Sequence, residues 1–205
     1  MQREEKSERS RRAVLDAALY LFSHQGYRAT TMREVADRAQ VSTGNVYHHF
    51  PDKEAIFREL LDEYIRITAT ARFPFTRVLE GPETFPDNIE ELGFAARDSV
   101  RQYRSYLALI YVDVIEFGGT HIRTFYGEMS KRFAHFFDEH GMEEQIQSRL
   151  RPEVSPVAAM LLTSRLFFNY FSLEILFGVD EPFGKNTSEV VKEIADIIRN
   201  GVCAR

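Results

Sequence analysis

The sequence of 205 residues is poor in cysteine and has no long hydrophobic run. Its one cysteine, Cys203, can form no internal disulfide and no multi-cysteine metal site, and we interpret it as incidental. No apolar run reaches the roughly 18 residues that a membrane-spanning helix needs. The N-terminus is charged and does not look like a signal peptide, so we expect the protein to stay in the cytoplasm.

Motifs of several common enzyme classes are also missing. The chain contains no G-x-x-x-x-G-K-S/T, no G-x-G-x-x-G and no H-E-x-x-H. His24, His121, His135 and His140 show no metal-ligand spacing, and Cys203 has no local partner motif for nucleophilic catalysis. We therefore expect no catalytic residues, no metal and no cofactor, and an enzyme is the least supported class of function.

Positive charge is not in excess, because the net charge is -5. Taken alone, this value argues against a nucleic-acid partner, but the charge is unevenly distributed. Residues 1–60 carry ten Lys and Arg against nine Asp and Glu, and the remainder carries 16 against 22. The first twelve residues hold five of these cations. They indicate either a basic arm that binds phosphates or a solvated, disordered tail.

Helical patterns run through almost the whole chain. Apolar residues recur with the helical period over residues 7–24, and Gly26 is placed to end that helix. Thr31 and Glu34 have the spacing of a capping box at the start of a two-turn helix. Proline and glycine interrupt the pattern over residues 73–86, the best candidate for a loop or boundary. Further helices are expected over residues 53–72, 87–104, 105–118, 120–139, 143–151, 155–178 and 190–200.

The ten residues from Val41 to Phe50 read V-S-T-G-N-V-Y-H-H-F and predict a very short helix that faces outward. Ser42 can cap it, and Val41 is spaced to pack on Val46 as a hydrophobic staple. Gly44 leaves one face bare, with hydrogen-bonding side chains around it. A helix with so little apolar surface must be presented by its neighbours. Two short helices joined by a tight turn are typical of the helix-turn-helix motif.

With these motifs in order, residues 11–57 resemble the N-terminal DNA-binding domain of the TetR family of bacterial transcriptional regulators. The matching residues are Leu15-Asp16-Ala17-Ala18, Leu21-Phe22, Gly26-Tyr27, Thr30-Thr31-Met32, Val35-Ala36, Ala39, Val41-Ser42, Gly44, Tyr47-His48-His49-Phe50 and Lys53-Glu54. One departure is Gln40, because the family commonly has glycine at this place. If the turn needs a positive φ there, Gln40 costs on the order of 1 kcal/mol.

The resemblance implies an all-α fold of about nine helices. Residues 1–52 would form an N-terminal arm and a three-helix, helix-turn-helix DNA-binding domain, and residues 53–205 a helical domain for ligand binding and dimerisation. The implied DNA contacts are Thr31, Ser42, Thr43, Gly44, Asn45, Tyr47, His48 and Lys53. Among them, Thr31 and Lys53 would sit on phosphates, and Thr43 and Asn45 have the chemistry to read base edges. For His49, packing within the motif is favoured over a contact with DNA.

The second half of the chain is rich in aromatic residues, most of which must be core. So many rings in a helical domain that accompanies a DNA-binding motif nevertheless predict an apolar pocket between helices, and we therefore expect a hydrophobic or aromatic effector. Asp113 interrupts an apolar helix, so it must be exposed, paired, or turned toward a polar ligand group. A salt bridge or a surface position is favoured. The alternative ligand site consists of Tyr103, Tyr106, Ile110, Asp113 and Phe117.

The last two helices each carry an apolar face. By resemblance these faces would pair with a second subunit in a four-helix bundle, although the same residues could be internal core. The predicted dimer residues are Leu161, Ser164, Phe168, Phe171, Ile175, Ile194, Ile197 and Ile198.

The predicted function is a homodimeric, DNA-binding repressor that a small effector releases from a palindromic double-stranded operator. Two alternatives stay open: a regulator without an effector, and a transcriptional activator. No membrane partner is expected.

Overall fold

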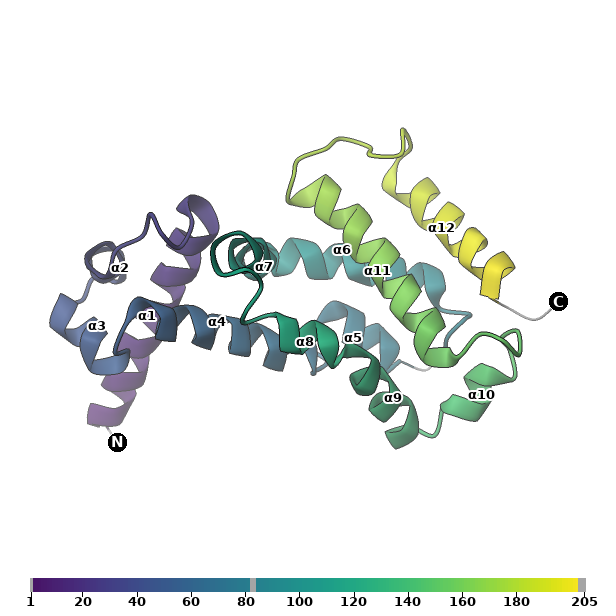
Figure 1. The fold of residues 1–205 in the computed structure, drawn as a ribbon, viewed down its shortest axis with the longest axis horizontal. Coiled ribbons are helices and arrows are strands. Elements are labelled where there is room, and N and C mark those ends of the chain that lie inside the picture. The colour runs from purple at the N-terminus through teal and green to yellow at the C-terminus, as the bar shows by residue number, and fades with distance from the viewer. Residues whose placement is uncertain (1, 82–83, 203–205) are drawn as a thin grey trace. The chain divides into compact units, whose positions relative to one another are not determined.

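A computed structural model describes residues 2–81 and 84–202; Cys203 lies outside them. These residues form twelve α-helices and no β-strand (Figure 1), so the predicted all-α class is confirmed and the expected number of about nine helices was too low. None of the helices has the length and apolarity needed to span a membrane.

The chain divides into two compact units. The first comprises residues 1–66 and 105–123, and the second comprises residues 67–104 and 124–205. The predicted division, with a boundary after residue 52, assigned the fourth helix to the regulatory domain. In the structure most of this helix and most of the seventh belong with the N-terminal helices.

Five helices build the first unit: α1 (Gln2–Gln25), α2 (Met32–Ala39), α3 (Thr43–His49), α4 (Lys53–Thr68) and α7 (Arg104–Phe117). Each contributes apolar side chains to a closed core. The fully buried members from α1 to α4 include Val14, Ala18, Phe22, Val35, Val46, Ile56, Phe57 and Leu60. The aromatic rings of Phe22 and Phe57 pack at a centroid distance of 5.7 Å, which joins α1 to α4.

Helix α1 starts earlier than the apolar period predicted. Its first turns contain the charged residues that were expected to form a basic arm or a disordered tail. Glu, Lys, Arg and Gln have good helix propensity and can form i,i+4 pairs, so these residues extend the helix without any apolar face. Gly26 ends α1 with φ of +88°, as predicted.

The start of α2 has the predicted cap, and the turn between α2 and α3 has the suspected left-handed residue. The Thr31 hydroxyl accepts from Glu34 N, and the Glu34 carboxylate accepts from Thr31 N at 2.7 Å, which completes the capping box. Gln40 has φ of 56° and ψ of 40°, so the left-handed conformation suspected from the sequence is present. Gln40 N donates to Asp37 O at 3.2 Å and Val41 N to Ala36 O at 3.1 Å. These two bonds are those of a Schellman motif.

Seven helices make up most of the second unit: α5 (Pro74–Leu79), α6 (Ile89–Gln102), α8 (Arg123–Gly127), α9 (Met129–Glu139), α10 (Glu143–Gln147), α11 (Pro156–Ile175) and α12 (Thr187–Val202). Helix α6 packs against α11 and α12. A Cβ atom on Gly93 would lie 2.8 Å from the ring of Phe167 and 2.9 Å from Val191, so glycine permits this close packing.

Two predicted boundaries in this unit were wrong. Residues 73–86, expected as a loop or boundary, contain α5. Pro74 stands at the start of this helix, where a missing N–H is harmless. Phe75 N donates to the Ser99 hydroxyl at 3.1 Å, which anchors that helix to α6. The single helix expected over residues 120–139 is divided into α8 and α9.

Replacing Gln40 with glycine should raise the free energy of unfolding by on the order of 1 kcal/mol, because glycine has no Cβ to clash in the left-handed region. Urea denaturation of the wild-type and variant proteins measures this difference in the free energy of unfolding. The control is Gln40→Ala, which shortens the same side chain and keeps the Cβ. A glycine variant no more stable than the alanine variant would show that Gln40 is unstrained.

Candidate nucleic-acid interface

Helix α3 presents a polar face held by very little apolar surface. Ser42 caps the helix by accepting from Asn45 N at 3.2 Å. Val46 is fully buried and anchors the inner side, while Thr43, Tyr47 and His48 are exposed. A Cβ atom at Gly44 would meet only the Ser42 hydroxyl, at 3.9 Å, so the bare backbone predicted there is open. Another surface can therefore approach α3 closely.

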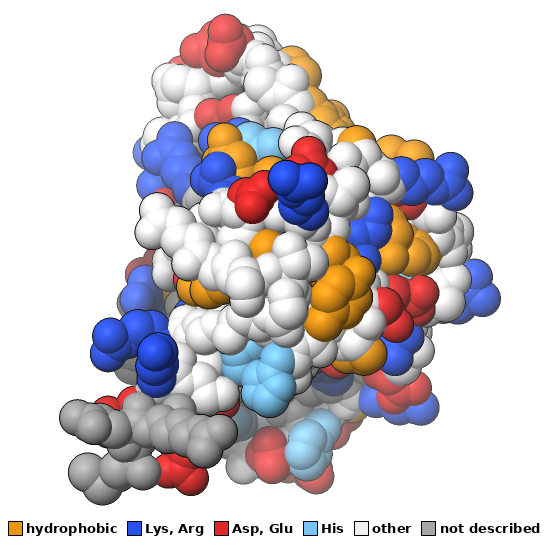
Figure 2. Space-filling model, turned by 90° about the vertical axis from the view of Figure 1, so that its left-hand side faces the viewer, with side chains coloured by type: hydrophobic (Ala, Val, Ile, Leu, Met, Phe, Trp, Pro, Cys, Tyr) orange, Lys and Arg blue, Asp and Glu red, His pale blue; other side chains and the backbone are white. Residues whose placement is uncertain are grey.

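Figure 2 shows this side of the first unit in space-filling form. Uncharged polar side chains and backbone, drawn white, cover much of its centre, and Lys and Arg side chains lie around them. Arg28 and Arg33 are highly exposed cations of this unit, and neither was among the predicted DNA contacts. Arg11 and Arg12 belong to the first twelve residues, for which a phosphate-binding arm and a solvated tail were both considered, and they pair with acidic residues. Arg11 lies 3.2 Å from Glu59, and Arg12 contacts Asp16 and Glu63.

Asn45 is half-buried, and its side chain is oriented by a neighbouring helix. The Ser10 hydroxyl on α1 donates a hydrogen bond to Asn45 Oδ1. The amide N–H groups of Asn45 remain to donate outward. Sequence reasoning missed Ser10, because 35 residues separate the two partners and no local pattern joins them.

The two residues predicted to sit on phosphates have internal partners as well. Lys53 Nζ donates to the carbonyls of Tyr27 and Thr30, both at 2.6 Å, and burial lowers the pKa of Lys53. One of its three N–H groups is left for a further acceptor. Thr31 is exposed and its hydroxyl takes part in the α2 cap. Phosphate contacts by either residue stay a prediction.

His49 lies beside α3's polar face but points inward. Its Nε2 atom is buried and meets no hydrogen-bond partner among the described residues. Burial lowers the pKa of His49, and the nearby positive charges of His48 and Arg11 add to this shift. These properties favour a packed, neutral imidazole, the interpretation preferred from the sequence.

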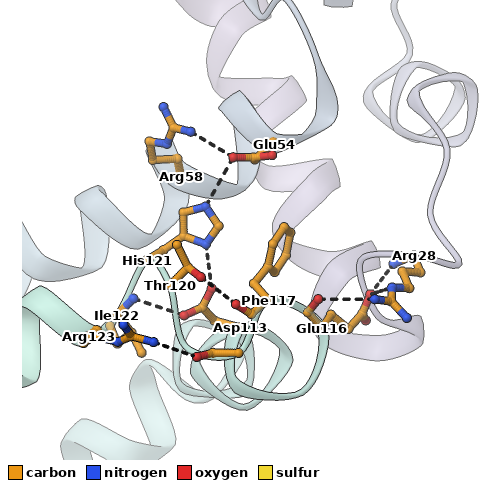
Figure 3. Close-up of polar contacts among 11 residues, drawn as sticks. Arg28, Glu54, Arg58, Asp113, Glu116, Phe117, Thr120, His121, Ile122 and Arg123 are labelled. Atoms are coloured by element: carbon orange, nitrogen blue, oxygen red, sulfur yellow. Dashed lines mark hydrogen bonds and ion pairs between the residues drawn. The ribbon is translucent and has the colours of Figure 1, made fainter.

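Asp113, the carboxylate that interrupts α7, has partners within the chain. It is fully buried, and His121 Nδ1 lies 2.6 Å from its Oδ1 atom (Figure 3). Ile122 N donates to the other carboxylate oxygen at 3.0 Å. The pairing favoured from the sequence is therefore present. The spacing could not identify His121 as the partner, because it follows the end of the helix.

The other predicted ligand residues also have contacts within the chain. Phe117 packs on Tyr27 and Phe57, at centroid distances of 4.6 and 5.0 Å. Tyr106 and Ile110 are buried in the first unit, where burial raises the pKa of Tyr106 to about 12. Tyr103 belongs to the second unit and donates to Arg72 O at 3.2 Å. A ligand role for these five residues remains a prediction.

The predicted dimer residues divide into two groups. Ser164, Phe171, Ile194 and Ile198 are buried within the second unit, so they form its core. Leu161, Phe168 and Ile175 are half-buried, and only Ile197 is well exposed, at 63%. Leu162 and Leu166, which the sequence pattern did not single out, are 58% and 47% exposed. Helix α11 is apolar on almost every side, so its periodicity does not identify the outer face.

Known proteins match the N-terminal part of the chain in sequence. The family model described as bacterial regulatory proteins, tetR family, matches residues 14–60. The HTH-type transcriptional repressor KstR2 of Rhodococcus jostii is 44% identical over 55 residues, or 27% of each protein. The uncharacterized regulator YuxN of Bacillus subtilis is 32% identical over 103 residues, covering 50% of this chain and 30% of that protein. The matched regions thus span less than a third of either relative.

Solved structures extend the similarity of fold over almost the whole chain. A putative TetR family regulator from Shewanella sp. PV-4 has a TM-score of 0.64 at 19% identity, covering 96% of this chain and 99% of that one. The ketosteroid regulator KstR2 of Mycobacterium tuberculosis has a TM-score of 0.61 at 20% identity, covering 95% of both. Residues 14–60 therefore match the family described as bacterial regulatory proteins, tetR family, and the chain shares its fold with solved structures titled as TetR family and ketosteroid transcriptional regulators.

Proposed function

We propose that the protein is a DNA-binding transcriptional regulator that inserts α3 into the major groove. The observation that carries this proposal is the outward polar face of α3, which is rigidly capped and has an open backbone at Gly44. A helix of this kind in a helix-turn-helix can approach base edges closely. Because its proposed partner is bacterial chromosomal DNA, the protein acts in the cytoplasm.

Within this face we assign two kinds of contact. Tyr47 and His48, with Ser42 and the exposed cations, bind phosphates and orient the protein on the duplex. Thr43 and Asn45 read base edges. The bond from Ser10 occupies the oxygen of Asn45, so we expect its amide to donate to acceptors such as purine N7.

We further propose that the protein is a homodimeric repressor bound to a palindromic operator. KstR2 of Rhodococcus jostii is named a repressor, and a two-fold dimer matches a palindromic site. The exposed apolar residues of the last two helices, Leu162, Leu166 and Ile197, support dimerisation there, because large apolar groups favour burial. Transcriptional activation is the alternative, and the DNA-binding geometry is common to both.

For the effector, we propose an apolar or aromatic compound with an acidic group, bound in the second unit. Arg132 on α9 supports the acidic group. Its guanidinium lies 5.0 Å from the centre of the Phe125 ring and donates to the Thr68 hydroxyl at 3.3 Å. Burial lowers the pKa of Arg132, and no carboxylate of the described residues pairs with it. A desolvated guanidinium favours a bidentate carboxylate partner.

Selection from random DNA pools should yield a palindromic consensus with half-sites about one helical turn apart. Asn45→Ala should relax the preference at one position of each half-site by about 1–3 kcal/mol and leave binding to random DNA nearly unchanged. Gln102→Ala, at the exposed end of α6, is the control. Sequence-independent binding by the wild-type protein would contradict the proposed function.

Sedimentation at micromolar concentration should give a dimer for the wild-type protein and a monomer for Leu166→Glu, since a buried charge disfavours an apolar interface. Ile115→Glu makes the same change at an exposed apolar residue of α7 and should remain a dimer. A wild-type monomer would refute dimerisation.

A thermal-shift screen should find stabilisation by apolar carboxylic acids but not by the matching alcohols. A ligand at a hundredfold excess over its Kd stabilises by about 2.7 kcal/mol. Arg132→Met should abolish the shift, whereas Arg165→Met, an exposed arginine over the Tyr126 ring, should retain it. If no compound stabilises the protein, the regulator without an effector is the better description.

A further inference from the structure

The turn of residues 26–30 connects α1 to α2 and leads directly into Thr31, the cap of α2. Two of its backbone N–H groups point at one carboxylate from a distant part of the chain. Tyr27 N donates to Glu116 Oε1 at 3.0 Å, and Arg28 N donates to Oε2 at 2.7 Å. Figure 3 shows Glu116 reaching from α7 toward Arg28. The carboxylate therefore holds the turn by both of its oxygens.

A positive charge holds the same turn through its carbonyl groups. Lys53, at the start of α4, donates to Tyr27 O and Thr30 O, so the N–H and the C=O of Tyr27 are bound by opposite charges. The Lys53 ammonium also lies 4.1 Å from the centre of the Tyr27 ring. We name the turn together with Glu116 and Lys53 the turn clamp. Charge-assisted hydrogen bonds of this kind are about twice as strong as neutral ones.

Gly26 makes room for the carboxylate. It has φ of +88°, and a Cβ atom there would lie 2.9 Å from Glu116 Oε1. The Glu116 side chain is only 15% exposed, and its bond from Tyr27 N is partly buried, whereas its bond from Arg28 N is exposed. Partial burial strengthens the bond to Tyr27 and makes the loss of its acceptor costly.

The end of α7 that carries Glu116 is itself held against α1 and α4. The Phe117 ring packs on Tyr27 and Phe57. His121 lies between two carboxylates, with Nδ1 at 2.6 Å from Asp113 and Nε2 at 3.5 Å from Glu54 (Figure 3). The position of the Glu116 carboxylate therefore depends on the position of α7 as a whole.

We propose that Glu116 is a positioning residue for DNA binding: through the turn clamp, α7 sets the orientation of the α2 N-terminus and, with it, of α3. The inference rests on the proposed function. Glu116 is on α7 and bonds the turn, so it acts on DNA only through α2. Helix α7 follows α6 after one residue, Tyr103, where the chain passes from the second unit to the first, and Glu116 lies at the other end of α7.

The test compares Glu116→Gln with wild type, well below the melting temperature, on the selected operator and on random DNA. Glutamine keeps the shape but leaves one turn N–H without an acceptor. We expect operator affinity to fall about tenfold or more, because a hydrogen bond to a charged group is lost, and random-DNA affinity to change less than twofold. Amide hydrogen exchange at Tyr27 and Arg28 should accelerate. Glu139→Gln, an exposed glutamate on α9, should change none of these values.

A purely structural role would lower the melting temperature without changing operator affinity in the folded protein, and that result would overturn the proposal. An equal loss on operator and random DNA would also overturn it. Gly26→Ala provides a second variant, which should act in the same direction by crowding the carboxylate. If wild type itself shows no operator preference, the proposed function fails, whereas unchanged exchange at Tyr27 and Arg28 in Glu116→Gln refutes the clamp alone.

Discussion

The first unit depends on one constraint: α3, with seven residues and a single fully buried side chain, cannot be stable by itself. Its start is determined by the Ser42 cap and by the left-handed turn at Gln40. Its inner side is held by Val46 in the core. The remaining residues of the helix can therefore be polar, and Thr43, Tyr47 and His48 are exposed, which is the property that a DNA-reading helix requires.

Around this helix, charged groups mostly hold backbone and neighbouring helices in place. Lys53 and Glu116 bind opposite groups of the turn before α2, and Arg11 and Arg12 pair with α4. A basic residue near a DNA-binding face is therefore not by itself evidence of a phosphate contact. Because these bonds are partly shielded, removing one partner costs more than a surface ion pair would.

Predictions based on local spacing were the most reliable. The capping box of Thr31 and Glu34, the Ser42 cap and the end of α1 at Gly26 all depend on residues within four positions of one another. Predictions that required a partner residue far along the chain, or the side of a helix that faces outward, were less accurate. For Asp113 a salt bridge or a surface position was expected, and its partner His121 was not identified. Four of the eight predicted dimer residues are buried within the second unit, and two of these four lie on α11, which is apolar on almost all sides.

The sequence by itself determined the all-α class, the helix-turn-helix and the residues that face outward on α3, because caps, periodicity and turn conformation are local properties of the chain. Only the tertiary structure decided which groups meet across long separations: Ser10 with Asn45, and Glu116 with the turn at Tyr27. Such contacts follow from helix packing, in which the position of a side chain depends on every helix around it, and no spacing in the sequence encodes them.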